Sequence, residues 1–167
     1  MLPYLSTTVW TYKKDDKTLK EETNEVMYEH RCELIVNGIS WLSFICSPSN
    51  LDDLAIGFLW NENIISDLSE IKSLRVSADG NSVTTELTHP VEKPRFFHRT
   101  STGMSLQHEQ QYPQVTTEPE LTADEIIALY ERFSQQQQLH DDIGGFHSAA
   151  LTDGKEIPIQ MEDLGRH

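Results

Sequence analysis

Apolar and polar positions alternate over much of the first half of the chain, which predicts β-strands. The segment 4–12, YLSTTVWTY, is rich in Thr, Val and aromatic residues and predicts one strand. From 25 to 46 the apolar positions keep an approximate period of two, and Asn37-Gly38 lies in the middle. Because these two residues suit the positive φ angles of a type I′ turn, we predict a β-hairpin over 25–46.

The period changes after residue 50, where the spacing of apolar residues becomes that of one helix face. The residues that define this face are Leu51, Leu54, Ala55, Phe58 and Leu59. Ser49 or Asn50 is expected to cap this helix through its side chain. Gly57 within the helix costs about 1 kcal/mol relative to Ala, so we expect close packing of a neighbouring element against it.

Two further hairpins and a second helix are predicted in the rest of the chain. The turn residues ADGN separate the strand-like segments 71–77 and 82–88. Thr122 and Glu125 have the spacing of a capping box, followed by the apolar face of a helix. The segments GGFHSAAL and EIPIQM, joined by TDGK, predict the last hairpin. An α+β or mixed α/β fold follows from this order of elements.

We divide the chain into three parts. Residues 1–88 form a β-rich part with one helix, and 121–167 begin an α/β part. Residues 89–120 contain four prolines and no clear periodicity, which predicts a polar loop that is either functional or disordered. The last predicted strand is followed at once by EDLGRH, so this end is either a tail or the start of a longer fold.

Composition narrows the classes of partner. The formal net charge of −14 disfavours nucleic acid, although Arg95, His98 and Arg99 form one candidate anion-binding patch. Two cysteines do not make a disulfide framework and suit a reducing compartment. No apolar run approaches the ~18 residues of a membrane span, and the first residues lack the features of a signal peptide. We therefore expect a cytoplasmic protein that does not enter a membrane.

Three short segments could carry chemistry, and each has a plainer interpretation. RTSTGMSL presents hydroxyl groups on Thr102 and Ser105, which need a general base to act and otherwise form a surface loop. GGFHSAAL places two glycines before His147, a candidate site residue or a structural histidine. EDLGRH combines acidic and basic side chains, as a site or as a solvated tail. No metal-binding motif is present, so we expect no metal.

Taken together, these segments resemble one family in their order and spacing. The matching stretches are CELIVNGISWLSFICSPSNLDDLAIGFLWNENII, RTSTGMS, GGFHSAAL and MEDLGRH. They are similar to the formate dehydrogenase accessory proteins, which are sulfur carriers that mature the molybdenum cofactor. The resemblance covers the whole chain but only about the first three-fifths of a typical member of that family.

The resemblance implies a fold, a reaction and partners. The fold would be a cytidine-deaminase-like domain, incomplete here, with a β-rich N-terminal part. A cysteine desulfurase would place sulfur as a persulfide on a Cys-Gly-x-Cys loop, from which it reaches molybdopterin guanine dinucleotide for formate dehydrogenase. A homodimer is one assembly left open. The residues expected to line the site of this anionic cofactor are Arg99, Gly103, Gly144, Gly145, His147, Glu162, Asp163, Arg166 and His167.

The sequence departs from the family where the chemistry is done. Thr102 and Ser105 stand at the positions of the two loop cysteines, and a hydroxyl cannot carry a persulfide. Cys46 precedes the predicted helix, and we expect it to pack in the core and not to replace the carrier. The alternatives are therefore a cofactor-binding or docking chaperone without sulfur chemistry, or an inactive truncated homologue.

Overall fold

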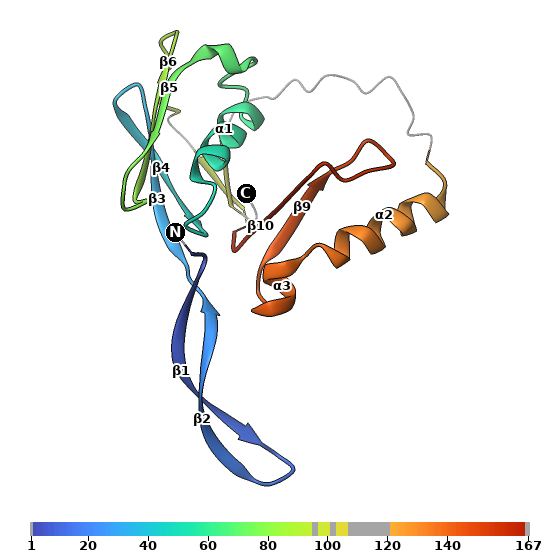
Figure 1. Ribbon diagram of the computed structural model, residues 1–167. Coiled ribbons are helices and arrows are strands. Elements are labelled where there is room, and N and C mark those ends of the chain that lie inside the picture. Colours follow the sequence, from blue (N-terminus) through green and yellow to red (C-terminus); the bar gives the residue numbers. More distant parts are fainter. Residues whose placement is uncertain (1, 95–96, 101–102, 107–120, 166–167) are drawn as a thin grey trace.

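The core of the protein is a four-stranded sheet covered on one face by a helix (Figure 1). The structure is a computed structural model that describes residues 2–94, 97–100, 103–106 and 121–165. The sheet contains β3 (His30–Val36), β4 (Ile39–Cys46), β5 (Ile71–Val76) and β6 (Ser82–Leu87) in the order β4-β3-β6-β5. Neighbouring strands are antiparallel except β3 and β6, which are parallel.

The alternation of apolar residues decides which face of the sheet is buried. Cys32, Leu34 and Val36 of β3 point into the core, as do Val83 and Leu87 of β6. Helix α1 (Leu51–Asn61) buries Leu51, Ala55, Phe58 and Leu59 against them. The helix face predicted from the sequence is therefore confirmed, apart from Leu54, which is only partly buried.

The predicted Asn37-Gly38 turn is confirmed, but the hairpin that contains it is shorter than predicted. Both residues have positive φ, 48° and 77°, and Val36 pairs directly with Ile39. The residues from 25 to 27 belong instead to β2 (Thr18–Met27), which pairs with β1 (Tyr4–Lys13). A period of two is the same in both hairpins, so it could not show where the chain changes its partner strand.

Two details of α1 differ from the prediction. The Asn50 side chain makes no capping hydrogen bond, because the residue adopts a left-handed conformation with φ of 50°. Ser49 makes no such bond either. A Cβ atom on Gly57 would have no neighbouring atom within 4 Å, so nothing packs closely against it. The expectation of close packing at Gly57 is wrong, and the glycine instead faces open space.

The predicted hairpin over 71–88 is confirmed by β5 and β6, preceded by a 3₁₀ turn over Leu68–Glu70 that was not predicted. Part of the predicted polar loop is also a hairpin, in which β7 (Phe97–Thr100) pairs with β8 (Gly103–Leu106). Each strand has only four residues, which is too short for the pattern of polar and apolar residues to reveal it.

The last part of the chain contains the predicted helix and hairpin. Helix α2 (Ala123–Gln135) begins at the capping box of Thr122 and Glu125, which confirms that prediction. The short helix α3 (Gln138–Asp142) was not predicted. Strands β9 (His147–Leu151) and β10 (Ile159–Asp163) pair antiparallel, so the third predicted hairpin is confirmed.

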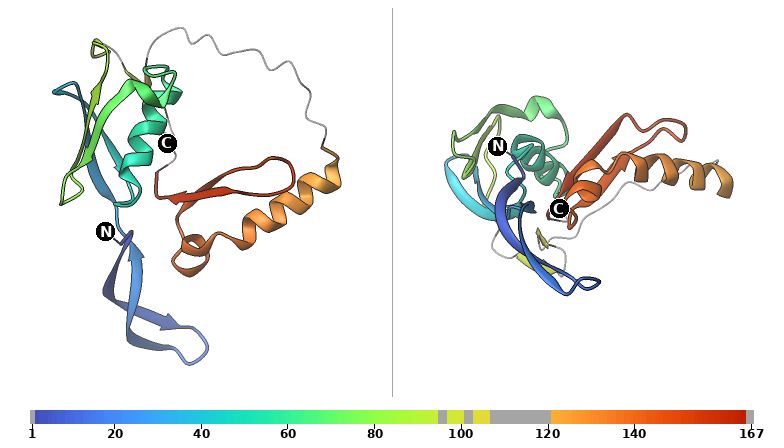
Figure 2. Two further views of the ribbon diagram at one scale, coloured as in Figure 1. Left: turned by 45° about the horizontal axis from the view of Figure 1, so that its top comes forward. Right: turned by 60° about the horizontal axis from the view of Figure 1, so that its bottom comes forward.

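Helix α1 lies between the four-stranded sheet and the β9–β10 pair, with α2 and α3 beyond them (Figures 1 and 2). The β1–β2 hairpin extends away from the four-stranded sheet, and its base lies beside α3 (Figure 1). This arrangement confirms the expected mixed α+β class, whereas the cytidine-deaminase-like assignment stays a prediction. No helix among the described residues has both the length and the apolar character needed to cross a membrane.

Candidate functional site

The residues that begin EDLGRH are bound to the end of β4. Asp163 accepts hydrogen bonds from the backbone N–H of Ser47, at 2.6 Å, and of Gly165, at 2.9 Å. The N–H of Leu164 donates in turn to the Ser47 hydroxyl at 3.0 Å. Ser47 is only 1% exposed. Ser47, directly after β4, and the EDLGRH segment are therefore in contact although they are far apart in the sequence. The described residues of EDLGRH are not a solvated tail.

Glu162, the first residue of that motif, is also engaged by the backbone. Its two carboxylate oxygens accept hydrogen bonds from the N–H groups of Leu139 and His140, both at 3.0 Å. These amides lie in α3, so Glu162 fixes this short helix against β10. The predicted cofactor role of Glu162 stays a prediction, and in the structure its carboxylate fastens one element to another.

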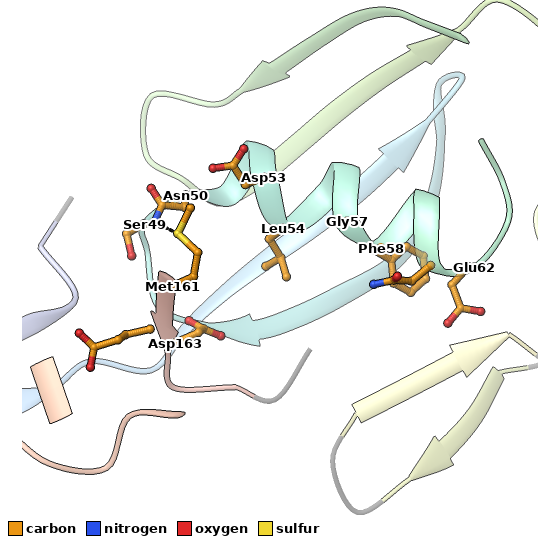
Figure 3. Close-up of a pocket in the computed structure, with 11 residues that line it drawn as sticks. Ser49, Asn50, Asp53, Leu54, Gly57, Phe58, Glu62, Met161 and Asp163 are labelled. Atoms are coloured by element: carbon orange, nitrogen blue, oxygen red, sulfur yellow. Dashed lines mark hydrogen bonds between the residues drawn. The ribbon is translucent and has the colours of Figure 1, made fainter. Parts of the chain in front are cut away.

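A cavity of about 290 Å³ lies beside these contacts, between α1 and β10 (Figure 3). Leu54, Gly57 and Phe58 contribute from the helix, and Met161 contributes from the strand. The Asn50 side-chain amide donates to the Met161 sulfur at 3.5 Å, which connects the two sides. The complete lining is Ser49, Asn50, Asp53, Leu54, Gly57, Phe58, Asn61, Glu62, Met161, Glu162 and Asp163.

The charge of the lining limits what this cavity binds. It includes four carboxylates and no Lys or Arg among the described residues, and these four are Asp53, Glu62, Glu162 and Asp163. A neutral or cationic apolar group fits this lining better than a phosphate does. Across the described part of the chain, no group of His, Cys, Asp and Glu side chains is arranged to hold a metal ion.

The backbone conformation explains why glycine occupies the two predicted site positions 144 and 145. Gly144 and Gly145 have φ angles of 81° and 80°, a region that L side chains rarely adopt. A Cβ atom on Gly145 would also lie 1.9 Å from the Met27 side chain at the end of β2. The glycines therefore let the chain pass β2 closely before β9 begins.

His147 begins β9 with an exposed side chain, and its backbone pairs with that of Asp163. The structure thus brings these two predicted site residues to the same end of the β9–β10 pair, beside the cavity lined by Asp163. His147 also takes part in a further interaction within the protein, so it is not without a partner.

The remaining predicted site residues fall where little or nothing is described. The backbone of β7 and β8 holds Arg99 opposite Met104, Ser105 opposite His98, and Gly103 opposite Thr100. Thr102, Arg166 and His167 lie outside the described residues. The proposed role of these positions rests on the sequence.

The two cysteines of the chain are buried in the core. Cys32 is 1% exposed and Cys46 is fully buried, and both are free thiols. Burial raises the pKa of both thiols, and the Asp163 carboxylate adds to the effect on Cys46, whose pKa rises to about 12. The expectation that Cys46 packs in the core is therefore confirmed.

Comparison with known proteins identifies the family. The family model described as the FdhD/NarQ family matches residues 27–167. This chain belongs to the FdhD/NarQ family. Curated relatives within it include the sulfur carrier protein FdhD of Wolinella succinogenes, 30% identical over 162 residues that cover 92% of this chain and 57% of that protein.

A second relative, the sulfur carrier protein FdhD of Staphylococcus aureus, is 29% identical over 92% of this chain and 62% of its own length. The chain thus spans about three-fifths of the curated FdhD proteins that it matches. A crystal structure of a proposed formate dehydrogenase accessory protein from Desulfotalea psychrophila superposes with a TM-score of 0.75. That match covers 98% of this chain and 64% of the other, at 17% identity, and it shows that the fold is shared.

The family membership was predicted from the motifs, but the cavity was not. Its wall residues Asp53, Glu62 and Met161 lie within the stretches that resemble the family, but nothing in the sequence marked them as neighbours around one cavity. The one available signal was Gly57, which is costly within a helix. The sequence permitted close packing or open space at this position, and only the structure distinguishes them.

Proposed function

We propose that this chain acts in the maturation of formate dehydrogenase, where sulfur passes from a cysteine desulfurase to the molybdenum cofactor, and that its own part is to bind and not to carry sulfur. The names of the curated relatives support the sulfur-carrier context. The burial of both cysteines supports the restriction to binding, and it is the observation on which the proposal depends. Free thiols also agree with a reducing, cytoplasmic location.

A persulfide carrier needs an accessible thiolate. The thiolate attacks the outer sulfur of the donor persulfide, the S–S bond of the donor breaks, and the donor leaves as a thiolate. Cys32 and Cys46 are shielded from any donor protein, and their raised pKa keeps them protonated near neutral pH. The hydroxyls of Thr102 and Ser105 form no exchangeable bond to sulfur. These 167 residues therefore contain no competent carrier group.

Binding is the activity that remains for these residues. The client would be molybdopterin guanine dinucleotide, delivered to formate dehydrogenase, with His147 and Asp163 at the end of β9–β10 as contacts. The acidic cavity suits the uncharged part of this client, and the phosphates would need Arg99 or Arg166. Docking to the dehydrogenase and to the desulfurase completes this proposal.

Sulfur loading tests the proposal directly. The protein is incubated with a cysteine desulfurase and L-cysteine, and its intact mass is measured before and after reduction. We expect no sulfur adduct on the wild type, and we expect one on the Thr102→Cys, Ser105→Cys double variant. A reducible adduct on wild-type Cys32 or Cys46 would overturn the proposal.

An exposed pair with the same spacing provides the control for nonspecific loading. Ser66 and Ser69 are both exposed and three residues apart. If the Ser66→Cys, Ser69→Cys variant takes up as much sulfur as the loop variant, the loop has no special relation to the donor. Selective loading of the loop variant would show that the desulfurase still recognises this scaffold.

A further inference from the structure

The β9–β10 pair, with α2 on one of its faces, leaves apolar surface uncovered. The Gln160 side-chain amide of β10 donates to the Phe133 carbonyl of α2 at 3.4 Å, so this face of the pair lies against the helix. Side chains alternate along a strand, and Leu151 and Ile159, which pair directly, therefore lie on the opposite face. They are 62% and 50% exposed. A sheet with apolar side chains on the face away from its helix needs a second covering layer.

Helix α2 is wider than the sheet that it covers. Leu129 on its apolar stripe is buried, but Ile126 and Tyr130 on the same stripe are more than half exposed. Adjacent strands are about 4.8 Å apart, whereas a helix with its side chains is about 10 Å across. Two strands are therefore too narrow to cover this stripe, and a further strand would widen the sheet.

The outer edge of β9 is where a strand can be added. β10 lies toward α1, because Met161, Glu162 and Asp163 line the cavity with that helix, and the described lining includes no residue of β9. Within the described residues, β9 pairs only with β10. Its five residues, His147 to Leu151, include no Asp, Glu, Lys or Arg. Strand edges without charges, prolines or bulges pair readily with a further strand.

We propose that this surface binds the polypeptide segment that makes up the remaining two-fifths of the longer relatives, and that this segment adds a strand to the outer edge of β9 and covers Leu151 and Ile159. The two curated FdhD proteins match this chain over 57% and 62% of their length. The Desulfotalea psychrophila structure shares the fold over 98% of this chain but only 64% of its own. The same elements therefore occur in longer chains, and the uncovered surface of α2 and β9–β10 is where the rest would pack.

The chemistry of the surface disfavours other occupants. Its uncovered side chains are apolar, so a partner must be apolar where it meets them, which excludes a nucleic acid. Pairing of two copies at this surface would bring together chains of net charge −14, and α2 itself carries Asp124, Glu125 and Glu131. The association does not involve sulfur, so it is independent of the function proposed above.

Copurification tests the association. The part of the Staphylococcus aureus FdhD that this chain does not match is produced with an affinity tag in the same cells as the full 167-residue chain. The two should copurify, and Leu151→Glu should weaken their association at least about tenfold, because it buries an unpaired charge. Leu19→Glu is the matched control, since Leu19 is also a strand residue and is 60% exposed, but belongs to the β1–β2 hairpin. This variant should bind like the wild type.

Hydrogen exchange locates the contact. The same segment is joined after His167, so that a segment that does not fold alone still gives a result. The amides of β9 should exchange about tenfold more slowly in the joined protein than in the 167-residue chain, whereas those of β1 should not change. Leu151→Glu should restore the faster exchange. The proposal is wrong if β9 exchanges equally fast in both proteins, if β1 is slowed as much as β9, or if Leu19→Glu has the effect of Leu151→Glu.

Discussion

Replacing Asp163 tests whether one carboxylate joins the β9–β10 pair to the core. Asp163→Ala removes the acceptor of two backbone N–H groups, those of Ser47 and Gly165. The Ser47 amide is the more important of the two, because Ser47 is almost completely buried at the end of β4. No water is expected to reach this amide as long as the surrounding structure keeps its conformation.

The size of the effect follows from these contacts. A hydrogen bond to a charged group contributes roughly 1.5–3 kcal/mol, and a buried N–H left without a partner costs a similar amount. The Gly165 amide is two residues from Asp163, and water replaces that bond more easily. We therefore expect Asp163→Ala to lower the free energy of unfolding by about 3 kcal/mol.

Urea unfolding followed by tryptophan fluorescence measures this loss, and amide hydrogen exchange at Ser47 locates it. Asp153→Ala is the matched control, because Asp153 also accepts two backbone hydrogen bonds, at 2.8 and 2.7 Å from Lys155 and Glu156. Those amides lie in an exposed turn where water replaces the carboxylate, so the control should lose much less stability. Equal losses for the two variants, or an unchanged exchange rate at Ser47, would refute this reasoning.

Further predictions concern two glycines and one thiol. Gly145→Ala should destabilise the protein by roughly 1–3 kcal/mol in thermal unfolding, because its Cβ would overlap Met27 at a positive φ angle. Gly57→Ala should instead stabilise the protein by up to about 1 kcal/mol, because a Cβ there has no neighbouring atom within 4 Å. Destabilisation by Gly57→Ala would contradict the open space there. Burial and the Asp163 carboxylate raise the pKa of Cys46 from 9.0 to about 12. The contribution of this thiol to the free energy of unfolding is therefore fully present below pH 9 and is lost as the pH rises towards 12. Cys46→Ala should lose less stability over that range in urea titrations, and an identical pH dependence would disprove this.

The sequence determined a helix or a turn wherever its residues or their spacing were compatible with only one local structure. Asn37-Gly38 specified a two-residue turn because few other residues accept two positive φ angles, and Thr122 with Glu125 specified the start of α2. The spacing of apolar residues specified the buried face of α1. The order of the short motifs was sufficient to predict the family, which the comparison confirmed.

Tertiary structure decided where equivalent local patterns find their partners. The alternation from 4 to 46 is shared by two hairpins, and only packing placed β1 and β2 outside the core. The ligand roles predicted for Glu162 and Asp163 stay predictions, but the backbone contacts of these carboxylates could not be predicted, because the type of a side chain does not reveal which amides it will meet. The cavity beside Gly57 arises from the approach of α1 and β10, which are far apart in the chain. Such contacts depend on three-dimensional position, and the local sequence does not encode them in any period or motif.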